Sequence, residues 1–191
     1  RNTWLPASRA FEQACLAAGF SSCEDANAPG TTGVGPLPLN NPNGIRWSTA
    51  IGYLGMSRHR LNLTIRSGIS VKRVLFDDKN ELPRAIGVEA VSEDETFIIE
   101  ADEVILSAGA VASPQLLMLS GIGPANHLSE QGIESVVDLP GVGQNLSDHP
   151  MLYVTWKTKP EVDLDALGPR IQLTLRYTAT DSELENDMIV Y

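Results

Sequence analysis

Apolar and polar positions follow two different periods along the first hundred residues, and these periods predict both helices and strands. In residues 4–18 apolar side chains recur at helical spacing along one face. Residues 69–76, 85–91 and 96–100 are apolar and β-branched segments separated by short polar turns. The three segments predict an antiparallel β-meander within residues 61–101.

A long stretch without regular periodicity separates the first helix from the meander. Glycine and proline interrupt residues 21–44 repeatedly, which predicts an irregular loop. Within it, Gly33-Val-Gly35 lacks the preceding strand and the third glycine of a dinucleotide-binding fingerprint, so we interpret it as a turn. Residues 48–54 predict a short helix that is capped by Ser48 and broken at Gly55.

The next stretch predicts a strand, a turn and a helix in that order. Residues 104–106 form a short apolar run that is typical of a buried strand. A turn of small residues follows, after which Ser113 can cap a helix that has Pro114 at its first position. Residues 115–119 supply the helix, and Gly121 ends it.

Ser107, Ala108 and Gly109 lie in the turn of this unit. A strand followed by a helix places backbone N–H groups and a helix N-terminus at the carboxyl end of the strand, where α/β proteins bind phosphate-bearing cofactors. Small side chains there allow close approach to the backbone. Tight packing at an ordinary strand-to-helix corner explains the same residues, and local physics leaves both interpretations open.

Beyond Gly121 the pattern predicts one further short helix and then extended segments. They cover residues 125–131, 136–139, 151–157, 171–177 and 188–191. The whole chain is therefore predicted to have an α/β fold with a first domain over residues 1–150. Residues 151–191 are expected to begin a second, sheet-based domain.

Composition narrows the classes of partner. The net charge of the 191 residues is −10, which argues against nucleic-acid binding because phosphate contacts need clustered cations. No apolar run reaches the length of a membrane-spanning helix. Cys15 and Cys23 lack metal-ligand spacing and are expected to be free thiols.

The stretch around residues 102–124 resembles the second signature of the glucose–methanol–choline (GMC) oxidoreductases. The matching positions are Gly109-Ala110, Ser113-Pro114, Leu116-Leu117 and Ser120-Gly121-Ile122-Gly123-Pro124. Further segments resemble the family on both sides: Gly44-Ile-Arg46-Trp-Ser48-Thr49-Ala50, Asn62-Leu63-Thr64 and Asp138-Leu139-Pro140-Gly141-Val142-Gly143. The resemblance covers roughly residues 4–150.

This resemblance implies an FAD-dependent oxidation of a small-molecule alcohol, in which hydride passes to the flavin and a distant histidine removes the hydroxyl proton. It implies that Val71 contacts the adenine through its backbone, with Ile69 as the alternative position and a plain core role as the other interpretation. It also implies that Ser107, Ala108 and Gly109 run close to the cofactor.

Two elements of the family pattern have no counterpart in this sequence: the glycine-rich dinucleotide fingerprint and the downstream catalytic histidine. We therefore expect an internal segment that holds part of a Rossmann-like FAD-binding domain and the start of a substrate domain, and that is inactive alone. It contains no catalytic residue by this interpretation, and His149 is expected to anchor a loop. A hydroxynitrile lyase of the same family and a non-catalytic folded module remain as alternatives. Apolar faces at residues 104–106 and 116–119 are expected to favour self-association.

Overall fold

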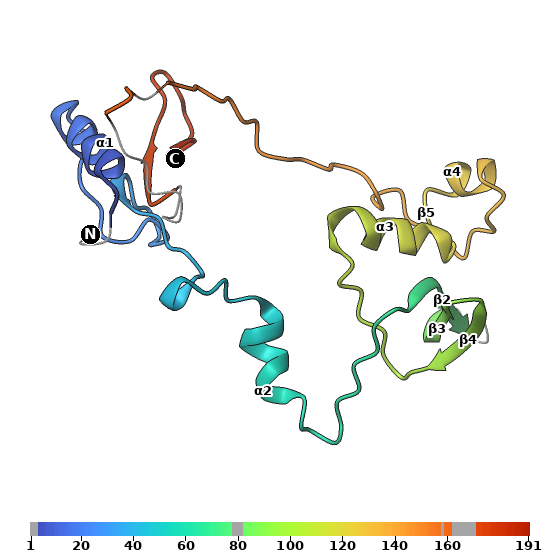
Figure 1. Ribbon diagram of the computed structural model, residues 1–191. Coiled ribbons are helices and arrows are strands. Elements are labelled where there is room, and N and C mark those ends of the chain that lie inside the picture. Colours follow the sequence, from blue (N-terminus) through green and yellow to red (C-terminus); the bar gives the residue numbers. More distant parts are fainter. Residues whose placement is uncertain (1–3, 78–81, 158, 162–170) are drawn as a thin grey trace. The chain divides into compact units, whose positions relative to one another are not determined.

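The computed structural model describes residues 4–77, 82–157, 159–161 and 171–191, which divide into two compact units (Figure 1). Unit 1 combines Arg1–Leu63 with Val154–Tyr191, and unit 2 is Thr64–Tyr153. The first 63 residues thus pack with the C-terminal residues, whereas we expected residues 1–150 to share one domain. The assignment of cofactor and substrate domains to these regions stays a prediction.

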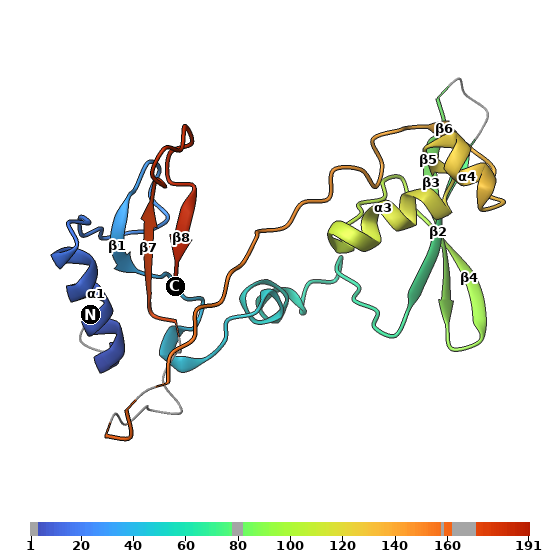
Figure 2. The same cartoon turned by 90° about the horizontal axis from the view of Figure 1, so that it is seen from above.

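Unit 1 contains a helix beside a three-stranded antiparallel sheet (Figure 2). The sheet has the order β1-β7-β8, and its core contains Cys15, Val34 and Leu175, with partly buried aromatic residues packed against them. The predicted N-terminal helix and the two C-terminal strands are confirmed. The elements are α1 (Pro6–Ala17), β1 (Gly33–Pro36), β7 (Leu173–Tyr177) and β8 (Met188–Val190).

The prediction of a turn at Gly33-Val-Gly35 was wrong, because these residues form strand β1. Val34 is fully buried, and its N–H donates to Ser21 O at 2.8 Å. Gly35 allows the Cys23 backbone to lie against the strand, since a Cβ there would overlap the carbonyl oxygen and sulfur of Cys23. The glycines permit close approach of two backbones here, and they do not mark a chain reversal.

Three short helical segments follow β1 in unit 1: η1 (Pro42–Gly44), the π-helical turn η2 (Ala50–Leu54) and α2 (Gly55–Ser57). Ser48 Oγ accepts a hydrogen bond from the N–H of Ile51 at 3.3 Å, so the expected hydroxyl at the helix start is present. The expected break at Gly55 is wrong, because Gly55 has helical dihedral angles and α2 continues directly from η2.

Unit 2 is built on the predicted meander, which is confirmed as an antiparallel sheet of order β2-β3-β4. Helix α3 lies against β2 (Figure 1), and a short parallel pair, β5 and β6, flanks helix α4 (Figure 2). The elements are β2 (Ser70–Asp77), β3 (Arg84–Ser92), β4 (Glu95–Glu100), α3 (Gly109–Leu119), β5 (Ile122–Gly123), α4 (Ala125–Glu130) and β6 (Val137–Asp138). The turn expected after residue 77 lies outside the described residues.

Two predicted strands are not formed. Residues 104–106 have no regular secondary structure and pair with no strand among the described residues, and Ile105 is 78% exposed. Residues 151–157 likewise belong to no sheet in the described part of the chain, and every one of them is exposed. An apolar sequence forms a strand only where a partner accepts its backbone hydrogen bonds. Neither segment has such a partner within the described ranges.

The surface of unit 2 exposes apolar side chains at the positions from which we expected self-association, including Ile105 and Leu119. Self-association through these residues stays a prediction. Within the described residues, the helices are too short or too polar to cross a membrane.

Cys15 and Cys23 are buried in unit 1 as thiols that form no disulfide with each other, as expected. Burial raises the pKa of the Cys15 thiol. Because the thiolate is the reactive form, we expect Cys15 to be alkylated by iodoacetamide at pH 8 much more slowly than in the urea-unfolded chain, and faster as the pH rises. Mass spectrometry of a timed reaction measures this, and equal rates in folded and unfolded chain would contradict it.

The same shift predicts the direction of a stability change. At pH values between the pKa of the thiol in the unfolded chain and its raised pKa in the folded state, Cys15 keeps its proton when folded and loses it when unfolded. The stabilisation from this group is therefore complete below the unfolded pKa and is lost as the pH rises through the folded pKa. A Cys15→Ala variant should lose this alkaline pH dependence in urea titrations.

Candidate cofactor-binding site

Helix α3 begins directly at the small-residue turn. It starts at Gly109, earlier than predicted, and Ala108 is its N-cap residue. Ser113 is therefore not the cap, and Pro114 lies inside the helix. Ser113 Oγ instead accepts a hydrogen bond from the N–H of Ala108 at 3.0 Å and holds the turn from within the helix.

Gly109 gives the turn its conformation and leaves it open. Its φ of +89° lies in the left-handed region, which glycine adopts readily and other residues rarely do. Apart from its chain neighbours and the nearby backbone of α3, no atom of the described residues lies within 4 Å of the position that a Cβ would occupy. Ser107, Ala108 and Gly109 are all exposed, so a planar group can approach this backbone.

The start of α3 also carries partial positive charge. The N–H groups in the first turn of an α-helix have no acceptor within the helix, and the aligned peptide dipoles add to their field. This end of α3 contains no acidic residue to oppose that charge. The turn is therefore suited to an electron-rich oxygen of a bound cofactor.

Val71 lies on β2, an edge strand that has β3 as its only neighbour among the described strands. The N–H of Val74 donates to Ser120, away from β3, so Val74 and its partner Val88 form a pair that does not exchange hydrogen bonds. Such pairs alternate along an antiparallel ladder. Ala90 is two residues from Val88 and pairs with Val71. Val71 and Ala90 therefore form another pair that exchanges no hydrogen bonds, and the peptide groups of Val71 face away from β3.

A register shift makes this placement of Val71 possible. Between Val71 and Arg73 the ladder is irregular, and Lys72 has no partner on β3. The extra residue shifts the alternation along β2 by one position. The peptide groups of Val71 and Val74 therefore face the same free edge of β2, although the two residues are three positions apart. Val71 is 39% exposed, so it lies outside the buried core of unit 2.

Ser120 joins the end of α3 to the free edge of β2. Its Oγ accepts from the N–H of Val74 at 2.8 Å and donates to Leu116 O at 2.6 Å. Ser120 and Val74 are 6% and 5% exposed. No local sequence signal indicates this contact of Ser120, because its partner on β2 is 46 residues away.

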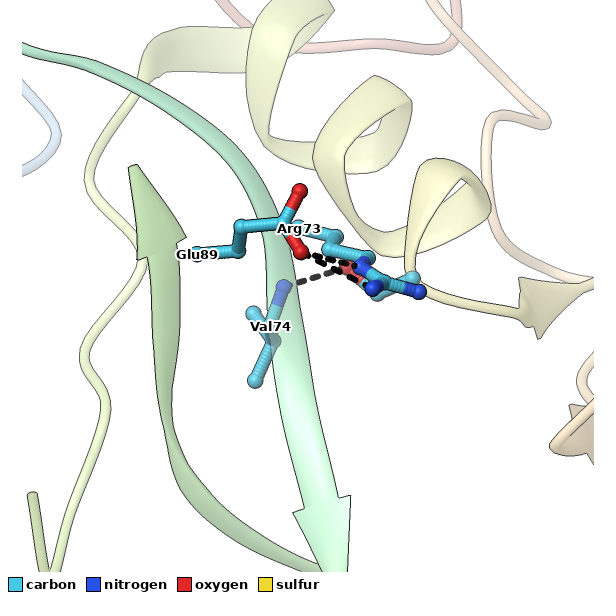
Figure 3. Close-up of polar contacts among 4 residues, drawn as sticks. Arg73, Val74 and Glu89 are labelled. Carbon is cyan, nitrogen blue, oxygen red and sulfur yellow. Dashed lines mark hydrogen bonds and ion pairs between the residues drawn. The ribbon is translucent and has the colours of Figure 1, made fainter. Parts of the chain in front are cut away.

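An ion pair spans β2 and β3 beside this contact (Figure 3). Arg73 donates through Nε and Nη2 to Glu89 Oε2 at 3.1 and 2.8 Å, and the two residues are directly opposite in the ladder. Because Arg73 is more than half exposed, water screens the pair and its contribution to stability is small. Its geometry fixes the register immediately after the bulge.

A cavity of about 750 Å³ lies along the same part of β2. Residues 73–76 line one side, and residues 119–121 and 132–136 line the other. The cavity leaves room beside the free edge of β2 and is bounded by the segment that carries Ser120.

Arg46 and His149 are exposed residues that belong to different units. Arg46 is exposed beside a cavity of about 870 Å³ in unit 1, and it forms no ion pair with any residue that the structure describes. The backbone N–H of His149 donates to Asp148 Oδ1 at 2.7 Å. The His149 ring makes no hydrogen bond within the described ranges, so it anchors no loop there.

Comparison with known proteins gives a consistent result. A family model described as GMC oxidoreductase matches residues 2–151. A GMC-type oxidoreductase from Rhodococcus erythropolis is 47% identical over 187 residues, covering 94% of this chain and 37% of that protein. An oxygen-dependent choline dehydrogenase from Escherichia coli O17:K52:H18 is 42% identical over 163 residues, covering 83% of this chain and 29% of that protein.

Solved structures are similar as well. The crystal structure of pyridoxine 4-oxidase from Mesorbium loti superposes with a TM-score of 0.67 at 35% identity, covering 73% of this chain and 27% of that one. The chain thus spans about a third of the length of the curated relatives that it matches.

Proposed function

This chain belongs to the GMC oxidoreductase family, whose cofactor is FAD, and from this premise we propose that the whole protein oxidises an alcohol carbon by hydride transfer to FAD. One observation in this chain supports the proposal most directly. Two accessible backbone segments, at Val71 and at Ser107-Ala108-Gly109, belong to the same unit, on β2 and at the start of the helix that lies against it. They fit a cofactor that is bound through peptide groups.

Each segment has a separate role in this proposal. The N–H and C=O of Val71 bind the adenine edge, because a strand edge offers a donor and an acceptor side by side. The turn from Ser107 to Gly109 lies along the cofactor and orients it, and the start of α3 stabilises negative charge there. FAD, when bound, supplies the hydride acceptor, and the protein supplies position and electrostatics.

We propose in addition that the 191 residues alone do not turn over an alcohol. An alcohol releases hydride readily only as its hydroxyl loses a proton, which requires a positioned base. No histidine in the described part of this chain is placed with a hydrogen-bonded partner as such a base would be. The base and the remaining cofactor contacts would then come from other parts of the whole protein.

The full-length protein tests the reaction class. We expect the purified protein to show flavin absorbance, and its flavin to be bleached anaerobically when choline or a benzylic alcohol is added. The 191-residue chain, assayed with a dye acceptor, serves as the inactive control. Cyanohydrin cleavage without bleaching would favour a lyase, a protein without flavin would favour a non-catalytic module, and either result would contradict the proposal.

A further inference from the structure

We propose that Ser120 is a positioning residue for the adenine end of FAD, an inference that rests on the proposed function. It acts through Val74, and it does not touch the cofactor. The observation behind it is the hydroxyl that joins the end of α3 to the same edge of β2 that carries Val71.

The hydroxyl of Ser120 has little freedom. Its single proton is donated to Leu116 O, and a lone pair accepts the N–H of Val74. A serine hydroxyl has one donor and two acceptor sites, so these two bonds fix its orientation. Ser120 and Val74 are buried. If the hydroxyl is removed, water therefore does not readily replace it as the acceptor for the N–H of Val74.

The position of this contact determines what it can control. Val71 precedes Val74 by three residues, about 10 Å along the strand, and the bulge at Lys72 lies between them. At the other end of α3, the turn at Gly109 lies roughly 16 Å from Ser120 by helix length. Ser120 is thus outside both proposed contact segments but connects the elements that carry them.

Without the hydroxyl, the free edge of β2 loses a fixed point beside an irregular stretch of the ladder. The Arg73–Glu89 ion pair still holds β2 to β3, so the sheet persists. The angle between β2 and α3 is no longer fixed by a hydrogen bond. The peptide groups of Val71 then meet the adenine in varying orientations, while the turn at Gly109 stays formed by its own contact with Ser113.

The test uses the full-length protein, stripped of flavin and titrated with FAD and with FMN, which lacks the adenosine half. Ser120→Ala is expected to raise the FAD dissociation constant about tenfold, as loss of one hydrogen bond predicts, and to leave FMN binding within twofold. Ser120→Thr, which keeps the hydroxyl, should restore FAD binding to within about threefold of wild type.

Leu128→Val is the matched control. Leu128 is fully buried on α4, so this variant lowers the melting temperature without altering β2, and its FAD binding should be unchanged. Should Ser120→Ala not fold, Ser120→Cys replaces it, because a thiol keeps the volume but forms only weak hydrogen bonds.

Equal losses of FAD and FMN affinity, or a Leu128→Val variant as impaired as the Ser120 variant, would show a purely structural role and overturn the inference. Unchanged FAD binding in Ser120→Ala would overturn it too. A wild-type protein that binds no FAD would instead contradict the proposed function, and the two failures are thereby distinguished.

Discussion

Replacing Gly121 with alanine is expected to lower the free energy of unfolding by about 3 kcal/mol or more, because two costs combine at this position. Gly121 has a φ of +84°, where an L-residue is strained. Its new Cβ would lie 2.7 Å from both Glu134 O and Val136 Cγ2. Neither can move away easily, because Gly121 O accepts from the N–H of Val136 and of Val137 at 2.8 and 3.1 Å.

Variants at two other glycines of unit 2 distinguish the cost of backbone strain from the cost of the close contacts. Gly132 has a φ of +70° but open space around its Cβ position, so Gly132→Ala should cost only the strain, about 1–2 kcal/mol. Gly141 has neither feature, so Gly141→Ala should stay within about 0.5 kcal/mol of wild type. Urea titrations of the full-length variants measure the series. Equal losses in Gly121→Ala and Gly132→Ala would show that the close contacts of Gly121 have no energetic weight.

The meander was predictable because its signals are local. Its three strands alternate with short polar turns, and each strand pairs with the one next to it in the chain, so periodicity places them to within a few residues. Strand β1 was not predictable by the same means. Gly33 pairs with Arg176, and nothing within residues 21–44 indicates a partner so far along the sequence.

Local signals can also compete, and the start of α3 is an example. Ser113 followed by Pro114 is a typical helix start, but in the structure the Ser113 hydroxyl accepts the Ala108 N–H from inside a helix that has already begun. Gly109 at positive φ determines the true start. The sequence contains both signals and does not by itself decide between them.

In the candidate site too, the sequence indicates some features, and others arise only when the chain folds. The resemblance pointed to Val71 and to Ser107, Ala108 and Gly109, and the structure shows all four exposed. Which edge of β2 carries the peptide groups of Val71 depends on the bulge at Lys72, and the fixed point at Ser120 depends on packing between distant segments. Such features arise only in the folded chain, so their role in binding stays a prediction that the flavin titrations address.

Gly35→Ala should destabilise unit 1 by about 3 kcal/mol through a different mechanism, since overlap with backbone atoms is among the costlier forms of overpacking. A Cβ at Gly35 would overlap the carbonyl oxygen and the sulfur of Cys23. The Cys23 backbone is held in place because its N–H donates to Val34 O at 2.8 Å. On its other side, Gly35 pairs with the fully buried Thr174, so β1 cannot shift away without breaking the sheet.

Thiol reactivity provides the measurement, because this sheet buries both cysteines. In Gly35→Ala, Cys15 and Cys23 should react with Ellman's reagent many times faster than in wild type, in parallel with a lower urea midpoint. Gly55→Ala is the matched control within unit 1: Gly55 is helical, and its Cβ would meet Ala50 O at an ordinary 3.5 Å. That variant should gain about 0.5–1 kcal/mol and keep its thiols protected. Wild-type thiol protection in Gly35→Ala would mean that β1 tolerates a side chain there, and that the close approach of the Cys23 backbone does not hold the strand in place.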